Sequence, residues 1–309
     1  MIIHTLKLLI FFAVSYSRLI IGSEVPAVSA GTLVTHQQFQ STHVIARDIY
    51  VWLPEGYAEN SLYDVLYMHD GQALFDAKKT WNGQEWGVDE TASKLISNGK
   101  VRPFIVVAIT NTVRRHSEYF PEEPWLSLSP AQRYDLLSRH RYGGNKIFEA
   151  DIQSDAYLRF LVDELKPFID QTYSVDSSRE HTFIMGSSMG GLISIYAVSE
   201  YPEIFAGAAC LSTHWAGIFD MQNNPIPAAF NDYLQARLPT PGRHKIYFDH
   251  GTKGLDALYP PLQVEVDKIM IAKGYSDQDW STIIQAGANH SENAWRDRLD
   301  IPLLFLLGK

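Results

Sequence analysis

The stretch "GSSMGG" occupies residues 186–191 and directly follows the apolar run "HTFIM" at 181–185. Its first five residues fit the pattern G-x-S-x-G, in which a serine lies on a sharp turn between a strand and a helix. Gly186 and Gly190 flank Ser188 because such a turn leaves no room for side chains. The turn directs the Ser188 hydroxyl outward and brings the backbone N–H of Met189 to the same space at a helix N-terminus. A turn of small residues that only packs a helix against a strand would look the same, so the flanking pattern must separate the two interpretations.

Short β-branched runs alternate with longer amphipathic segments over most of the chain, which predicts crossover units and a mostly parallel sheet. Before them, "TLVTHQQFQ" at 32–40 and "HVIARDIYVWLP" at 43–54 have the period-two pattern of antiparallel strands. The sequence therefore predicts an α/β-hydrolase fold: a mostly parallel central sheet with antiparallel N-terminal strands and helices on both faces. Residues 111–145 interrupt this alternation of strand-like and helical segments and exceed ordinary loop length, so we expect a functional lid or a disordered segment there.

The composition limits the class of protein and its partners. The chain has 309 residues, of which 46% are hydrophobic and 20% charged, as in an ordinary globular protein. Its formal net charge of −9 argues against a nucleic-acid partner. The single cysteine, Cys210, forms no internal disulfide, and its apolar neighbours "GAACLS" predict that it is buried. The sequence contains no H-E-x-x-H, paired C-x-x-C, Walker or G-x-G-x-x-G motif, so we expect no metal and no cofactor.

The first residues have a different character. "MIIHTLKLLIFFAVSYS" has one positive charge at Lys7, an apolar run from Leu8 to Val14, and then small or polar residues. This layout is typical of a secretory signal peptide, because the run is short for a bilayer and Arg18 interrupts it. An uncleaved N-terminal anchor is the alternative. We expect a signal peptide and leader over 1–31, one domain over 32–309, export to the periplasm or the medium, and no stable membrane insertion after cleavage. The sequence does not indicate an oligomeric state.

A reactive serine needs a base, and histidine is the residue that usually serves. In this fold the catalytic residues follow the order serine, acid, histidine, which leaves His214, His244, His250 and His290. His244 and His250 begin and end a strand-like run, where a structural role is expected. His290 lies in the polar loop of "QAGANHSEN", between the last β-type run and the last helix. We therefore predict His290 as the base, with helix capping as the alternative.

The acid should follow the strand-like run "HKIYFDHG" at 244–251, and two residues compete for the role. Asp249 lies on the run itself, whereas Asp256 lies in the loop "GTKGLDALY" beyond it and can reach His290 more freely. Glu265 is a third candidate. The acid orients the imidazole and stabilises its charge, so we favour Asp256. Asp249, or a serine–histidine pair with no acid, remain open.

Two further sets of residues complete the predicted site. A second oxyanion donor should come from the loop after an earlier strand, and "LYMHDGQALFD" at 66–76 offers Gly71 and Gln72 unless it is a simple D-G turn. Arg114 and Arg115 could meet an anionic substrate or be solvated. Several aromatic residues and one histidine could line an acyl or alcohol pocket, although most such residues belong to cores. These are Trp81, Trp86, Tyr119, Phe120, Tyr142, His214, Trp215 and Trp295.

Six motifs occur in a fixed order: "YMHDGQALFD", "EYFPEEP", "GSSMGGLISIYAV", "YPEIFAGAACLS", "YFDHGTKGLD" and "GANHSENAWRDRL". Together they resemble an esterase family of α/β-hydrolases that includes enterochelin (siderophore) esterases, feruloyl and acetyl-xylan esterase domains, esterase D and the mycolyltransferases. The resemblance extends from about Val44 to the C-terminus. It implies Ser188 as nucleophile, His290 as base, and the backbone N–H groups of Gln72 and Met189 as the oxyanion hole.

One feature departs from that family. Many members carry the acid after a "GT" pair and one intervening residue, a place that Gly254 occupies here, which leaves Asp256 as the substitute. The sequence thus predicts a serine esterase that hydrolyses small-molecule carboxylic esters through an acyl-enzyme on Ser188. An acyltransferase with the same residues, a peptidase, and a non-catalytic binding protein on the same fold are the alternatives. Whether the ester is a siderophore lactone, a cell-wall ester or a lipid acyl ester is left open.

Overall fold

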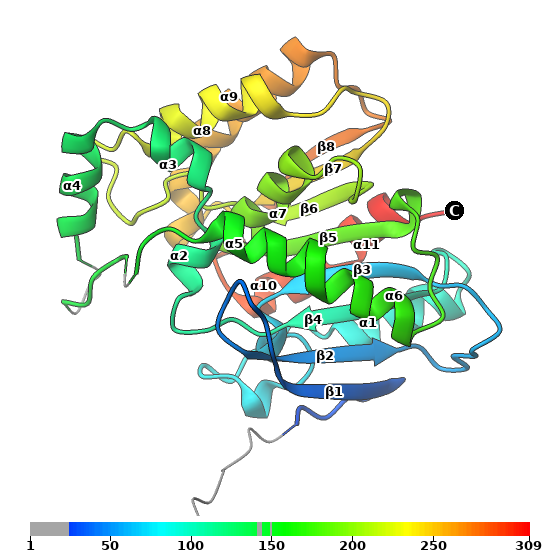
Figure 1. Ribbon diagram of the computed structural model, residues 1–309. Coiled ribbons are helices and arrows are strands. Elements are labelled where there is room, and N and C mark those ends of the chain that lie inside the picture. The colour runs from blue at the N-terminus through cyan, green and yellow to red at the C-terminus, as the bar shows by residue number, and fades with distance from the viewer. Residues whose placement is uncertain (1–24, 141–143, 149) are drawn as a thin grey trace, which may run out of the picture.

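The computed structural model describes residues 25–140, 144–148 and 150–309, and its eight strands form one sheet in the order β1-β2-β4-β3-β5-β6-β7-β8 (Figure 1). β2 runs antiparallel to β1 and to β4, and all later neighbours are parallel. The predicted α/β fold with antiparallel N-terminal strands is confirmed. The strands are β1 (Thr32–Phe39), β2 (Arg47–Leu53), β3 (Asp64–His69), β4 (Phe104–Ile109), β5 (Thr182–Ser187), β6 (Gly207–Leu211), β7 (Lys245–His250) and β8 (Trp280–Ile284).

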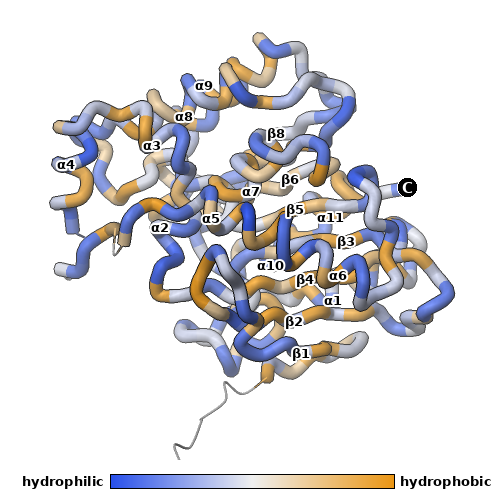
Figure 2. The backbone as a smooth tube through the Cα atoms, viewed as in Figure 1, coloured by the Kyte–Doolittle hydropathy of each residue, from blue (hydrophilic) through white to orange (hydrophobic). Residues whose placement is uncertain are grey.

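The central strands are apolar on both sides because each side is covered by helices. On β3, Val65 and Tyr67 enter one hydrophobic core, and Leu66 and Met68 enter the other. This is the expected alternation of side chains along a strand, and parallel strands of this kind are buried on both faces. The middle of the sheet is accordingly hydrophobic, as the orange strands of Figure 2 show.

The helices divide between the two faces. The core on one side draws on the helices from α2 to α9, and the core on the other draws on α1, α10 and α11. The first group is α2 (Arg115–Tyr119), α3 (Glu122–Ser127), α4 (Pro130–Ser138), α5 (Ser154–Arg159), α6 (Lys166–Thr172), α7 (Met189–Glu200), α8 (Ile226–Arg237) and α9 (Tyr259–Lys273). The second group is α1 (Val88–Ser97), α10 (Glu292–Arg296) and α11 (Asp300–Leu307).

The segment predicted as a long loop contains three helices, α2, α3 and α4, so that prediction is wrong over residues 115–138. The start of α4 shows why the sequence allows a helix here. The Ser129 hydroxyl accepts a hydrogen bond from the Gln132 N–H at 3.3 Å, and the Gln132 side chain accepts one from the Ser129 N–H at 2.8 Å. This reciprocal cap, with Pro130 at the first helical position, is a helix-start signal that outweighs the weak periodicity of the segment.

The residues before β1 are held against the sheet and α1. Trp52 on β2 donates its indole N–H to the Ala30 carbonyl at 2.8 Å, and the Ser29 N–H and hydroxyl both donate to Asp89 on α1, at 2.6 and 3.0 Å. The predicted signal sequence falls mainly on residues 1–24, which lie outside the described residues. Of the helices in the described ranges, none is long and apolar enough to cross a membrane.

Candidate active site

Ser188 lies at the carboxyl end of β5, on the turn that begins α7. Its backbone angles are φ 58° and ψ −120°, a combination that costs energy for a residue with a side chain. The surrounding structure holds this conformation: the Ser188 N–H donates to the Leu211 carbonyl of β6 at 2.9 Å, and the Ser188 carbonyl accepts from the His214 N–H at 3.2 Å. The strand–turn–helix context that the G-x-S-x-G pattern requires is therefore present.

The two glycines of the turn are required by close backbone contacts. A Cβ on Gly186 would lie 2.8 Å from the carbonyl carbon and oxygen of Gly190, a distance that real Cβ atoms do not show. A Cβ on Gly190 would lie 3.3 Å from the His69 Cβ at the end of β3. These small residues bring the start of α7 against both β5 and the loop that follows β3.

His290 and Asp256 come together at the same edge of the sheet. Asp256 lies in the 3₁₀ turn Gly254–Leu258 after β7, and His290 lies in the loop between β8 and α10. The Nδ1 atom of His290 and the Oδ1 atom of Asp256 are 2.6 Å apart. The Asp256 side chain is fully buried, and its second oxygen accepts hydrogen bonds from the Ser212 hydroxyl at 2.7 Å and the Gly251 N–H at 2.6 Å.

These contacts keep the Asp256 carboxyl ionised. Burial alone would raise the pKa of Asp256, but the hydrogen bond and charge of His290, together with the donors Ser212 and Gly251, outweigh burial. The pKa of Asp256 is consequently held below its ordinary value. A buried anion beside Nδ1 fixes the ring orientation and the tautomer that leaves Nε2 available to accept a proton.

Asp249, the competing acid, has a different partner. Its two oxygens accept hydrogen bonds from the Nε and Nη2 atoms of Arg298, each at 2.9 Å, and the ion pair is buried. Tyr247 donates its hydroxyl to the same carboxylate at 3.1 Å. The structure thus brings Asp256 and not Asp249 to His290, while Asp249 joins β7 to the segment after α10.

The proposed oxyanion donors lie on two adjoining segments. Met189 is the first residue of α7, and the first N–H groups of a helix have no partner inside it. Gln72 lies in the 3₁₀ turn Gly71–Ala73 after β3, which Gly190 allows to approach α7. A Cβ on Gly71 would lie 2.6 Å from the Ala108 carbonyl carbon, so the close path of this turn over β4 requires glycine.

A charged pair secures the turn that carries Gln72. Asp70 has a left-handed backbone (φ 59°), and its carboxylate accepts hydrogen bonds from Nε and Nη2 of Arg115, both at 2.7 Å. Asn111 donates its side-chain N–H to the same carboxylate at 2.6 Å. Burial would raise the pKa of Asp70, but the Arg115 charge and these donors hold it below its ordinary value. Arg115 is therefore engaged in holding the turn.

Sequence reasoning missed Tyr259, the first residue of α9. Its phenol oxygen lies 2.8 Å from the Nδ1 atom of His214, whose backbone N–H binds the Ser188 carbonyl at 3.2 Å. Its ring also meets the ring of His290 edge-on, with centroids 5.9 Å apart. Tyr259 follows Asp256 by three residues, a spacing that places two side chains on one side of a helical turn, and this was the available signal.

The aromatic residues predicted to line a pocket mostly belong to the core. Trp86 and Trp295 are buried and stack at 5.3 Å, and Trp295 also packs edge-on against His290 at 5.0 Å. Trp295 therefore supports the imidazole from behind, while its indole N–H donates to Ser212 at 2.9 Å. Trp86 takes part in the core shared with α1 and α11 and does not reach an open surface.

The other residues predicted to line a pocket differ in how far their side chains are buried. Tyr119, Phe120 and Trp215 are buried in the core on the α7 side of the sheet, so the prediction that they contact substrate is not supported. His214 is also buried, but its contact with Tyr259 makes it part of the site. Trp81, in contrast, is 91% exposed. Tyr142 lies outside the described residues, and Arg114 donates to Gln153 at 3.3 Å.

The described residues provide neither a metal-binding cluster nor a reactive thiol. Within the described ranges, no group of three or more His, Cys, Asp or Glu side chains is placed to hold a metal ion. Cys210 is buried on β6 as predicted, and burial raises the pKa of its thiol well above the ordinary value. A thiol in such surroundings remains protonated and is a poor nucleophile.

Comparison with known proteins agrees with this fold. A Bacillus subtilis protein described as "Uncharacterized protein YbbA" is 23% identical over 266 residues, which cover 84% of this chain and 92% of that protein. A ferulic acid esterase of Anaeromyces mucronatus, solved with ferulic acid, superposes with a TM-score of 0.62 at 16% identity, covering 91% of this chain and 92% of that one. The enterobactin esterase of Shigella flexneri gives a TM-score of 0.59 at 14% identity, covering 92% and 60%.

The sequence also matches a protein family over residues 45–301, nearly the whole described chain. That family carries the description "Putative esterase", and the chain belongs to it. The protein is thus a carboxylic ester hydrolase with the α/β-hydrolase fold, and the predicted family membership is confirmed.

The Asp70–Arg115 pair predicts a pH-dependent stability. Asp70→Asn removes the charge but keeps a residue that tolerates a left-handed backbone. Because the folded-state pKa of Asp70 is lowered, the ionised carboxylate stabilises the fold above the unfolded pKa of about 4, and this stabilisation is lost as the pH falls through the lowered pKa. We expect the wild type to be more stable than Asp70→Asn at pH 7, with a difference that shrinks below about pH 4.

Urea unfolding of both proteins between pH 7 and pH 3 measures this difference. Asp277→Asn, a change at an exposed aspartate far from the turn, is the matched control and should give a small difference at pH 7. A difference between wild type and Asp70→Asn that stays constant across the range would contradict the prediction.

Proposed function

We propose that the protein hydrolyses carboxylic esters through an acyl-enzyme on Ser188, with His290 as general base and Asp256 as the acid that orients it. The observation that carries the proposal is the 2.6 Å contact between buried Asp256 and His290 at the sheet edge where Ser188 occupies its strained turn. A strained nucleophile, a base and a buried anion that fixes the base are the parts of a serine hydrolase site.

The reaction proceeds in two halves. The Ser188 Oγ attacks the ester carbonyl carbon as its proton passes to Nε2 of His290, and the N–H groups of Gln72 and Met189 stabilise the negative oxygen that forms. The carbonyl re-forms, the bond to the alcohol breaks, and His290 returns the proton to the departing alkoxide. Water then attacks the acyl-enzyme, giving its proton to His290, and the acid leaves as Ser188 regains that proton.

Tyr259 has a positioning role in this scheme. Its phenol contacts the His214 ring, and the His214 backbone N–H binds the Ser188 carbonyl. Burial raises the pKa of Tyr259 well above its ordinary value, so the phenol stays protonated and acts only through hydrogen bonds. We propose that the Tyr259–His214 pair holds the Ser188 backbone in the turn that presents its hydroxyl.

We propose that exposed loops contact the substrate, because most of the aromatic side chains predicted to line a pocket are buried. Among the predicted aromatic residues that the structure describes, Trp81 is the exposed one, and the next residue, Asn82, donates to Glu292 at 2.8 Å, two residues beyond His290. We propose that Trp81 contacts the ester group that projects past His290. We also propose that the chain is exported, on the evidence of the signal-like residues described above.

Replacement of the nucleophile tests the reaction. Ser188→Ala should reduce the turnover of p-nitrophenyl acetate by several orders of magnitude and abolish the acylation burst, because removal of a triad nucleophile leaves only the residual effect of the oxyanion donors. Ser187→Ala, at the adjacent serine on β5, is the control and should retain activity. Near-normal turnover by Ser188→Ala would show that the nucleophile is elsewhere. Transfer of the acyl group to an added alcohol in preference to water would identify an acyltransferase.

The two buried aspartates should respond differently to the same change. Asp256→Asn should lower kcat by roughly four orders of magnitude with the fold retained, because the imidazole loses its anion and its preferred tautomer. Asp249→Asn leaves Arg298 buried without a full partner, so it should destabilise the fold by about 3–5 kcal/mol and leave the folded enzyme active. Enzyme kinetics and urea unfolding of each variant separate the effects. Nearly full activity in both variants would mean that Ser188 and His290 act without an acid.

The role of Tyr259 has its own test. Tyr259→Phe keeps the ring and removes the hydroxyl, so kcat should fall by about 2- to 10-fold, which corresponds to the roughly 0.5–1.5 kcal/mol of one hydrogen bond, with KM unchanged. The rate at which a phosphonate labels Ser188 should fall in parallel. Tyr275→Phe, which removes a hydroxyl that donates to the Pro239 carbonyl at 2.8 Å, is the matched control. Equal kinetics for wild type and Tyr259→Phe would exclude a positioning role.

A further inference from the structure

Ser212, the residue that follows β6, combines a strained backbone with complete burial. Its φ of 43° lies in the left-handed region, which is costly for a residue with a side chain, and the residue has no exposed surface. A strained and buried polar residue is maintained only where the surrounding structure holds it, and such residues cluster at functional sites. The contacts of Ser212 therefore show what the strain supports.

The Ser212 hydroxyl joins three side chains from segments that are distant in the sequence. It lies 2.7 Å from Oδ2 of Asp256, 2.9 Å from the indole Nε1 of Trp295 and 3.0 Å from Nη2 of Arg298. Indole and guanidinium groups can only donate, so they occupy the two acceptor sites of the hydroxyl. The hydroxyl proton is then directed at Asp256, and the chemistry of the partners fixes the direction of this hydrogen bond.

The backbone of Ser212 is held by the strands on both sides of β6. Its N–H donates to the main-chain carbonyl of Asp249 on β7 at 2.8 Å and to Oδ1 of the same residue at 3.1 Å. The preceding residue, Leu211, accepts the Ser188 N–H at the end of β5 at 2.9 Å. Because β5, β6 and β7 are neighbours in the sheet, Ser212 lies between the nucleophile turn and the segment that carries the acid.

The two oxygens of the Asp256 carboxylate have separate partners. Oδ2 accepts from the Ser212 hydroxyl at 2.7 Å and from the Gly251 N–H at 2.6 Å, and Oδ1 lies 2.6 Å from Nδ1 of His290. Two donors on Oδ2 restrict rotation of the carboxylate and leave Oδ1 for the imidazole. Of these two donors, only the Ser212 hydroxyl belongs to a side chain.

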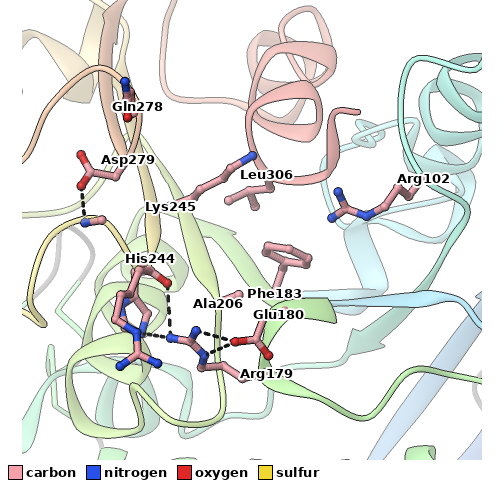
Figure 3. Close-up of a pocket in the computed structure, with 12 residues that line it drawn as sticks. Arg102, Arg179, Glu180, Phe183, Ala206, His244, Lys245, Gln278, Asp279 and Leu306 are labelled. Carbon is pink, nitrogen blue, oxygen red and sulfur yellow. Dashed lines mark hydrogen bonds and ion pairs between the residues drawn. The ribbon is translucent and has the colours of Figure 1, made fainter.

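The polar contacts at the opposite edge of the sheet are more exposed. Around the cavity at the amino ends of the strands, Arg179 pairs with the adjacent Glu180 at 2.5 Å and donates to the Arg243 carbonyl at 3.3 Å (Figure 3). The Glu180 side chain is 61% exposed, so water can replace a lost partner there. The contacts of Ser212 are buried, and a lost partner leaves a buried group unpaired.

We propose that Ser212 is a positioning residue for the acid: its hydroxyl holds the Asp256 carboxylate in the orientation that meets His290. Arg298 contributes through the hydroxyl, because a cation that donates to the oxygen polarises the O–H group and strengthens its donation to Asp256. The strained backbone keeps this hydroxyl directed at the acid. The inference rests on the proposed role of Asp256 and adds the residue that orients it.

Removal of the hydroxyl tests the inference. Ser212→Ala and Ser212→Gly both remove it, and glycine also tolerates the left-handed backbone. Each should lower kcat for p-nitrophenyl acetate by about 10- to 100-fold with KM unchanged, the effect of one hydrogen bond to a charged group. Ser199→Ala removes another buried hydroxyl, which donates to the Ile195 carbonyl of α7 at 2.9 Å, and should keep wild-type kinetics.

Two readouts separate positioning from a purely structural role. The Ser212 hydroxyl is one of the donors that lower the pKa of Asp256, so its removal should move the acid-side loss of kcat/KM to higher pH. In an Asp256→Asn background, Ser212→Gly should change kcat by less than about threefold, because the hydroxyl acts through the acid. A damaged fold would instead lower the amplitude of the acylation burst and leave the pH profile unchanged.

The outcomes decide between the inference and its alternatives. Wild-type kinetics and pH dependence in Ser212→Gly would overturn it, as would a loss explained entirely by fewer active molecules or a failure of both Ser212 variants to fold. If the proposed reaction itself were wrong, Ser188→Ala and Asp256→Asn would also keep activity. An error in this inference alone would leave those two variants impaired while the Ser212 variants stay active.

Discussion

The backbone contact between Gly186 and Gly190 is the constraint on which the site depends. It allows Ser188 to hold a φ of 58° with a ψ of −120°, a conformation whose energetic cost must be offset elsewhere. The offset comes from α7, which is almost entirely buried, and from the hydrogen bond between the Ser188 N–H and β6. Gly190 also leaves room for His69 at the end of β3, so the absence of a side chain at Gly190 allows both the nucleophile turn and the neighbouring turn of Gln72 to approach α7.

The second constraint is the separation of two buried carboxylates. Asp249 and Asp256 both contact Ser212, and two anions so near would repel unless each had its own compensation. Arg298 neutralises Asp249 through two hydrogen bonds, while backbone and hydroxyl donors and His290 compensate Asp256. A buried guanidinium thereby leaves Asp256 for the imidazole. The charge distribution, as much as the loop geometry, determines which acid meets the histidine.

Local sequence patterns predicted the fold and several residues of the candidate site. The alternation of runs predicted the sheet, the spacing around Ser188 predicted the turn, and the polar loop singled out His290. The burial of single side chains could not be predicted from local patterns. Trp81 and Trp86 lie five residues apart, yet Trp81 is 91% exposed and Trp86 is covered by Trp295 from the far end of the chain. Such outcomes depend on contacts between distant segments, as do the partners of Asp249 and Tyr259, which no local pattern encodes.

β7 runs from the edge of the sheet where the parallel strands begin to the edge where they end. Its charged residues show why the net charge of the chain does not predict the charge balance at either edge. Lys245 begins the strand and Asp249 lies four residues on, a separation of about 13 Å at the usual rise per residue. The Debye length at physiological salt is about 8 Å, so the exposed carboxylates of one edge do little to neutralise exposed cations at the other. Hydrogen bonds to β6 and β8 hold the strand on both sides, which keeps this separation fixed. The net charge of an acidic chain therefore does not predict the local charge balance at either end of β7, because each charge is compensated by the groups that pack beside it.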